Sequence, residues 1–374
     1  YIGSFLSLIV FLLGTNPSNA QGCVAVRPMG CSSQGNSSSI TKKEWQFGTT
    51  LRYYKSFRHY KGDVEQKERL EQNTEVINYA FSSDFNVAFG LTNRISVSAN
   101  LPVIYYDRSS LYEHYGNSAT ANPDHKRFNT KASGIGDIRL SMNYSITNPS
   151  EDSKLKLIAG FGIKLPTGDA NVQDEFHRLS IEKTDSTFIR PVDQSIQLGD
   201  GGVGFNLALQ TNLILSPRSL LYFNGFYMFN PKNKNETLTR GGDPAKADPL
   251  TGYHSVADQY AARIGASYVV LPKYHISASL GGRIEGIPAS DLIGDSEGFR
   301  RPGYIASVEP SITHSTSKTV LSLSVPYALY RNRIKSFSDK ADPAGLRHGD
   351  AAFADYLINL SFVYRFAPGG EHKM

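Results

Sequence analysis

The sequence predicts a transmembrane antiparallel β-barrel of about twelve strands, and three observations lead to this fold class. Apolar and polar residues alternate one by one along many segments, as they do on a strand with two different faces. The connections between these segments are alternately short and long. No run of about 20 apolar residues, the length that a membrane helix needs, occurs after the N-terminus. A soluble sandwich would also alternate, but it has no reason to sort its connections in this way.

The composition fits a barrel wall. Hydrophobic residues make up 40% of the 374-residue chain, yet the mean hydropathy is only -0.31, because alternation hides the apolar face. Tyr and Phe are frequent, with 21 and 20 copies, against one Trp and two Cys. The net charge of +5 is spread along the chain without a Lys/Arg-rich block, which argues against a nucleic-acid partner.

The first 43 residues are expected to lie outside the barrel. A short apolar run that ends in small residues predicts a signal peptide over 1–20, and therefore export. Together with the predicted outer-membrane barrel, this indicates a Gram-negative bacterium. Segment 21–43 follows as a periplasmic N-terminal segment. It contains Cys23 and Cys31, which are expected to form a disulfide in an oxidising compartment, while lipid attachment at Cys23 is the competing interpretation. Two Cys without nearby His do not make a zinc site.

The barrel itself is predicted over 44–366, followed by a tail over 367–374. Each strand is long enough to cross a bilayer when tilted, which takes about 9 to 11 residues. In order, the strands are expected at 44–58, 74–90, 94–106, 134–147, 154–167, 196–215, 219–231, 253–270, 273–287, 300–316, 318–334 and 353–366.

The connections predict the orientation of the barrel. Tight turns such as 91–93, 216–218 and 271–272 alternate with long segments rich in Gly, Pro, Asp, Asn and Lys. Bacterial barrels have short periplasmic turns and longer outer loops, so both termini are expected in the periplasm and the long loops outside the cell. The alternating, aromatic last strand, which ends at Phe366, resembles the signal that the barrel assembly machinery reads during biogenesis. Membrane lipid and this machinery are therefore expected partners.

Four stretches carry a resemblance to a known family: FGLTNRISVSANLP at 89–102, GIGD at 134–137, LPTGD at 165–169 and LGDG at 198–201. Together they resemble the outer-membrane transporter family named for the meta pathway of phenol degradation, over roughly residues 75 to 366. The resemblance implies a β-barrel that admits apolar substrates. Its motif residues here are Gly134, Gly136, Asp137, Pro166, Thr167 and Gly168. A structural role of these residues is a stronger interpretation than direct contact with the substrate, because Gly permits tight bends and Asp accepts hydrogen bonds from turn amides.

Charged residues on the polar faces of the strands are candidates for the lumen. Because both signs occur, an internal ion-pair network is the first interpretation and a polar conduit that orders a passing solute is the second. A barrel of about twelve strands also implies a narrow, selective pore rather than bulk diffusion. The candidates are Asp84, Asp137, Arg139, Lys156, Lys164, Arg263, Arg283, Glu285, Glu309 and Arg365.

No motif for enzyme chemistry stands out. A phosphate loop, a His-Glu-x-x-His metal motif and an EF-hand are all missing from the sequence, so no cofactor, no metal and no catalytic residue is predicted. An embedded lipid hydrolase would have to use His314 with Ser315 or His177 with Ser180, and neither pair has a recognisable nucleophile setting. The sequence therefore predicts porin-like passive transport of small apolar or aromatic solutes across the bacterial outer membrane. A structural or partner-binding barrel is the alternative, and the oligomeric state stays open.

Overall fold

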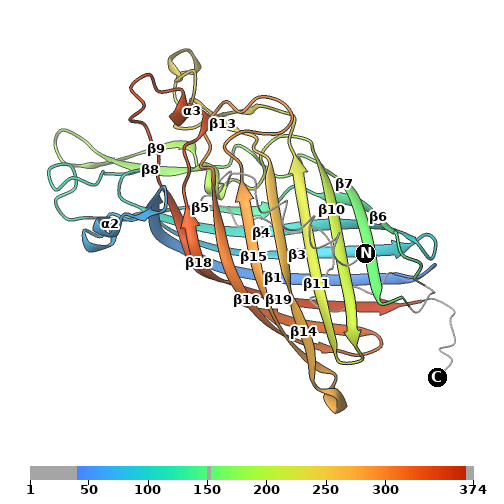
Figure 1. Cartoon of the computed structure of the whole chain (residues 1–374). Coiled ribbons are helices and arrows are strands. Elements are labelled where there is room, and N and C mark those ends of the chain that lie inside the picture. The colour runs from blue at the N-terminus through green and yellow to red at the C-terminus, as the bar shows by residue number, and fades with distance from the viewer. Residues whose placement is uncertain (1–39, 150–152, 368–374) are drawn as a thin grey trace.

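A closed barrel of twelve antiparallel wall strands forms the body of the protein (Figure 1). The computed structural model describes residues 40–149 and 153–367. Two wall strands are interrupted and are each made of two pieces. In order, the wall consists of β1 (Trp45–Lys61), β3 (Ile77–Gly90), β4 (Ile95–Ser110), β5 (Phe128–Ile135) with β6 (Arg139–Ser145), β7 (Leu155–Lys164), β10 (Gly204–Ser216), β11 (Ser219–Phe229), β14 (Gln259–Leu271), β15 (Ile276–Ile287), β16 (Gly303–Ser315), β17 (Thr319–Ser324) with β18 (Tyr327–Asn332), and β19 (Ala351–Phe366).

The barrel closes where the last strand pairs with the first. The β19–β1 ladder runs from the Phe366–Trp45 pair to the Ala351–Tyr60 pair, with register shifts near Ser56. Every other wall strand pairs with its neighbours in the sequence, so no wall strand is left with a free edge. The predicted fold class and the strand number are thus confirmed.

The two faces of the wall differ as the alternation predicts. On β3, Phe81 and Phe85 are 46% and 48% exposed on the outside, whereas Ser82, Asp84 and Asn86 are only 5–6% exposed on the inside. Exposure of many large apolar side chains on the outer face of the wall would be unfavourable in water but is favourable against lipid. On β3, the interior face accordingly holds the polar side chains.

Some strand boundaries differ from the prediction. The fourth strand starts at Phe128 rather than 134 and is broken over 136–138, and the sixth starts at Gly204 rather than 196. The eighth starts at Gln259, because 253–255 belongs to a separate two-stranded sheet. At the sixth and eighth strands, the preceding loop segments contain apolar residues that are buried, such as Ile196 and Val256, so their pattern resembles that of the wall.

The two ends of the barrel are unlike each other. Trp45 and Phe366 lie at the end with the short turns, which include η3 (Pro272–Tyr274). The long loops at the other end carry the small elements, seen at the upper left of Figure 1. These are β2 (Val64–Glu65), α2 (Lys67–Glu71), β8 (Gln173–Leu179), β9 (Asp185–Pro191), η1 (Gln194–Ile196), β12 (Lys234–Leu238), η2 (Pro244–Lys246), β13 (Tyr253–Ser255) and α3 (Phe337–Lys340).

The predicted signal peptide and the Cys23–Cys31 disulfide lie outside the described residues, as does most of the predicted tail. Within 40–149 and 153–367, no helix is long and apolar enough to span a membrane.

Candidate functional site

A loop segment folds into the interior of the barrel and forms one side of the candidate site. We call residues 192–200 the inner strap; it contains η1 and precedes β10. Val192 and Ile196 are completely buried and belong to one apolar cluster with inward-facing wall residues such as Tyr54, Ile104 and Tyr106. The strap therefore packs its apolar side chains against the inside of the wall rather than exposing them at the loop end.

Charged contacts fix the inner strap to two distant parts of the barrel. The Asp193 carboxylate accepts two hydrogen bonds from Arg301, at 2.7 and 2.6 Å, and lies 3.5 Å from Nη2 of Arg108 on β4. It also accepts bonds from the backbone amide and the hydroxyl of Ser195, at 3.0 and 2.6 Å. Burial raises the pKa of Asp193, but the charges of Arg108 and Arg301 outweigh burial and hold that pKa well below its ordinary value.

Three of the four motif stretches meet beside the strap. The break between β5 and β6 places Asp137 where its carboxylate accepts bonds from the amides of Gly168, at 3.0 Å, and Asp200, at 3.3 Å. The Thr167 hydroxyl donates to the Gly136 carbonyl at 3.0 Å and accepts from the amide of Ile138 at 2.8 Å. These bonds join the wall break, the end of β7 and the strap.

Glycine is required where these stretches touch. A Cβ atom on Gly136 would lie 2.7 Å from Cδ1 of Ile104, and one on Gly168 would lie 2.7 Å from the carbonyl oxygen of Leu198. Gly134 has a φ of +156°, and Pro166 is exposed just after β7. The contacts of these motif residues support the structural interpretation, although Asp137 also faces a pocket.

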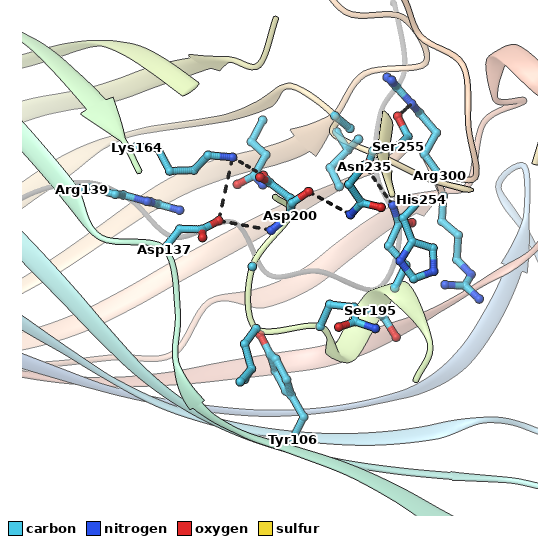
Figure 2. A pocket seen from close by; sticks show the side chains of 18 residues that line it. Tyr106, Asp137, Arg139, Lys164, Ser195, Asp200, Asn235, His254, Ser255 and Arg300 are labelled. Carbon is cyan, nitrogen blue, oxygen red and sulfur yellow. Dashed lines mark hydrogen bonds and ion pairs between the residues drawn. The ribbon is translucent and has the colours of Figure 1, made fainter. Parts of the chain in front are cut away.

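A pocket lies between the strap, the wall and the loop that carries β13 (Figure 2). Its polar lining includes Arg139, Lys164, Asp200, Asn235, His254 and Arg300. Its apolar lining includes Tyr106, Leu198, Ala257 and Ile287. Lys164 is 2% exposed on its side chain, pairs with Asp200 and lies 4.0 Å from Asp137. The pocket is amphipathic, and among its charges Lys164, Asp200 and Arg300 already have partners within the protein.

The structure places the ten lumen candidates on the interior side of the wall. Arg139, Lys164 and Asp137 line the pocket, and Asp84 is buried on β3. Four others form a second cluster: Nη2 of Arg283 lies 2.7 Å from Glu285, and Arg283 and Arg263 each lie 3.8 Å from Glu309.

The last two lumen candidates, Lys156 and Arg365, are half-buried. The contacts within the second cluster support the ion-pair interpretation for that part of the lumen. The pocket supports the conduit interpretation for the part of the lumen that contains Asp137, Arg139 and Lys164.

The surroundings of the two candidate hydrolase pairs do not fit a catalytic role. Nδ1 of His177 bonds to Asp185 at 2.9 Å and its ring stacks on Phe128 at 3.8 Å, while the Ser180 hydroxyl bonds to Thr184 at 2.7 Å. His314 is exposed on β16, on the side of the wall that carries the apolar residues. These contacts give no support to a nucleophile and base in either pair.

Several residues of the site did not stand out in the sequence. Arg108, Asp193, His254, Arg300 and Arg301 lie at strand ends or in long loops, where no period marks which side chains turn inward. The available signal was the apolar pair Val192 and Ile196 in an otherwise polar loop, because buried apolar residues in a loop indicate that the loop packs against something.

One comparison with a known structure supports the fold. No family model matches the chain and no curated protein matches it. Among solved structures, an outer membrane channel from Pseudomonas putida F1 superposes with a TM-score of 0.56 and 13% sequence identity, over 89% of this chain and 99% of that one. A toluene transporter of P. putida gives a TM-score of 0.42 and 9% identity, over 91% and 95% of the two chains. The chain thus shares the barrel fold of the first of these proteins.

Proposed function

We propose that this protein is a passive channel of the bacterial outer membrane that admits small apolar or aromatic solutes. The observation that carries the proposal is a closed barrel whose outside is apolar and whose interior holds an amphipathic pocket beside a pinned strap. The fold shared with an outer membrane channel is consistent with it. Membership of the transporter family named for the meta pathway of phenol degradation rests on the four sequence stretches and is part of the same proposal.

The outer surface supports a position in a membrane. Exposed apolar side chains occur on strands all around the wall, including Leu140 at 45%, Phe161 at 45% and Ile264 at 61%. At the short-turn end, the rings of Trp45 and Phe89 lie 4.6 Å apart and those of Phe47 and Phe366 lie 5.8 Å apart. Aromatic residues of this kind gather at the membrane interfaces of barrels. We infer a periplasmic location for this end and for both termini.

The interior supports a solute with an apolar part. Wide water-filled pores have polar interiors, whereas this interior contains the apolar cluster of Tyr54, Ile104 and Tyr106 under the inner strap. Tyr106 and Leu198 belong to this cluster and also line the pocket. A solute that passes beside the strap therefore meets apolar surface as well as paired charges.

Uptake across an asymmetric outer membrane tests this function. Cells that carry the protein should take up radiolabelled ethylbenzene faster than cells without it, because the lipopolysaccharide leaflet slows apolar solutes that a plain bilayer admits. A matched control is a barrel with Phe85→Arg, whose assembly is expected to fail. Equal initial rates with and without the folded protein, over a panel of apolar and aromatic solutes, would argue for the structural or partner-binding alternative. A stoichiometric companion that co-purifies in mild detergent would support that alternative directly.

A further inference from the structure

The most distinctive side chain of the pocket is His254, on β13. Its backbone is held by the chain just before β16: the amide of Phe299 donates to the carbonyl of Tyr253 at 2.7 Å, and the amide of Ser255 donates to the carbonyl of Phe299 at 3.0 Å. His254 itself is 1% exposed and lines the pocket. Figure 2 shows its ring beside Ser255 and Arg300, on the side of the pocket opposite Lys164. The backbone around His254 is thus held by two hydrogen bonds, whereas the ring makes none to the described residues.

The polar groups around His254 already have partners inside the protein. Arg300 makes two bonds to Asp291, at 2.8 and 2.5 Å, and a third to the Ser255 hydroxyl at 2.9 Å. The side-chain amide of Gln194 donates to the Ser255 carbonyl at 3.0 Å, and that of Asn235 donates to the Asp200 carbonyl at 2.9 Å. By contrast, neither ring nitrogen of His254 has a hydrogen-bond partner among the described residues. A buried polar group without a partner is costly unless something else occupies the site.

The charges at the pocket balance. Four cations, Arg139, Lys164, Arg300 and Arg301, face the pocket with two carboxylates, Asp137 and Asp200. Asp291 and Asp193 pair with Arg300 and Arg301. Arg108, which also contacts Asp193, pairs with Glu113, so five cations in and around the pocket are matched by five carboxylates. Burial lowers the pKa of His254 to about 4, so the ring is neutral at pH 7 and carries one donor and one acceptor. A charged ligand would remain uncompensated here, and a neutral ligand would not.

We propose that His254 binds the hydroxyl group of a small neutral solute whose apolar body rests on Tyr106, Leu198 and Ile287. A hydroxyl suits either tautomer of the ring, because it can donate to the bare nitrogen or accept from the N–H. One hydroxyl suffices, because the other polar groups named above are engaged with one another. The proposal rests on the proposed function and narrows its solute class from apolar or aromatic molecules in general to amphipathic alcohols.

Calorimetric titration of the purified full-length barrel in detergent tests this assignment, with benzyl alcohol, ethylbenzene and benzoate as probes. His254→Phe should weaken binding of benzyl alcohol by about tenfold, the loss that corresponds to one buried hydrogen bond, and should leave the affinity for ethylbenzene unchanged. His254→Gln keeps a donor and an acceptor and should retain most of the affinity. His314→Phe, the same change on the outer side of β16, is the matched control and should behave as the wild type.

The assignment is wrong if His254→Phe binds benzyl alcohol as well as the wild type does, or if it loses both neutral probes equally. Tighter binding of benzoate than of benzyl alcohol would replace the neutral solute with an anion. If His254→Phe fails to fold, NMR of the wild type with carbon-13 labelled histidine provides a second measurement. The chemical shift of the His254 ring should change with benzyl alcohol and not with ethylbenzene. An unchanged chemical shift with benzyl alcohol overturns the assignment. Uptake of ethylbenzene without any preference for the alcohol would sink this inference and leave the channel function intact. Binding of the alcohol hydroxyl without uptake of any solute would support the role of His254 and argue against the channel function.

Discussion

Replacement of Asp193 by Asn should release the inner strap from its position in the lumen. The carboxylate holds two guanidinium groups, with hydrogen bonds of 2.6 and 2.7 Å to Arg301, whose side chain is 13% exposed, and a contact of 3.5 Å to Arg108, whose side chain is 2% exposed. Loss of one partner from a buried ion pair costs about 3–5 kcal/mol, because the other charge remains buried and uncompensated. A change of that size alters the ratio of released to pinned strap by a factor of roughly 10² to 4 × 10³.

Single-channel recording in planar bilayers measures this release. Asp193→Asn should show longer or larger open states than the wild type, while Asp295→Asn, in the exposed part of the loop before β16, should not. Because folding lowers the pKa of Asp193, the ionised carboxylate stabilises the pinned strap fully above the ordinary carboxyl pKa. This stabilisation is lost only as the pH falls through the much lower pKa of Asp193 in the folded protein. The strap contact of the wild type should therefore be independent of pH between about 5 and 8. An unchanged conductance in a variant that still migrates as a folded barrel on unheated gels would refute the pinning role of Asp193.

Three other predictions concern stability. Gly136→Val should lower the free energy of unfolding by about 1–3 kcal/mol, because its Cβ would lie 2.7 Å from a wall side chain, whereas Gly282→Ala has open space and should be nearly neutral in the same urea titration. Burial lowers the pKa values of the His114 and His254 rings to about 4. Below about pH 6.5 the folded protein therefore binds fewer protons than the unfolded protein, and the urea midpoint should fall as the pH drops towards 4. A midpoint that is constant or rises over this range would contradict the assignment. Phe85→Arg places a charge on the lipid face, which costs about 2–4 kcal/mol near the bilayer centre. The variant should therefore lose the difference in gel migration between heated and unheated samples that marks a folded barrel. A variant that keeps this difference would mean that the face with Phe85 does not contact lipid.

The wall of the barrel was predictable because two different surroundings act on every strand. Residues such as Phe81 and Ser82 are adjacent in the sequence but meet opposite sides of the wall, so the pattern has a period of two that can be read directly. The strap and the pocket were not predictable in this way. Val192 and Ile196 follow no period, and the contact between Asp193 and Arg301 joins residues 108 positions apart. Of the pocket, the sequence indicated Asp137, Arg139 and Lys164, which lie on or beside wall strands, but not His254, which lies in a loop.

The pinned strap also constrains the order of events during biogenesis. Asp193 precedes the sixth wall strand, but Arg301, its principal partner, immediately precedes the tenth. Contacts between residues so far apart form late, since the intervening chain must first be brought together. The contacts of the strap with Arg108 and Tyr106 can form earlier, but the hold of Arg301 on Asp193 must wait until most of the wall is in place. A nascent barrel should therefore be leakier than the finished one and become fully selective only late in its assembly.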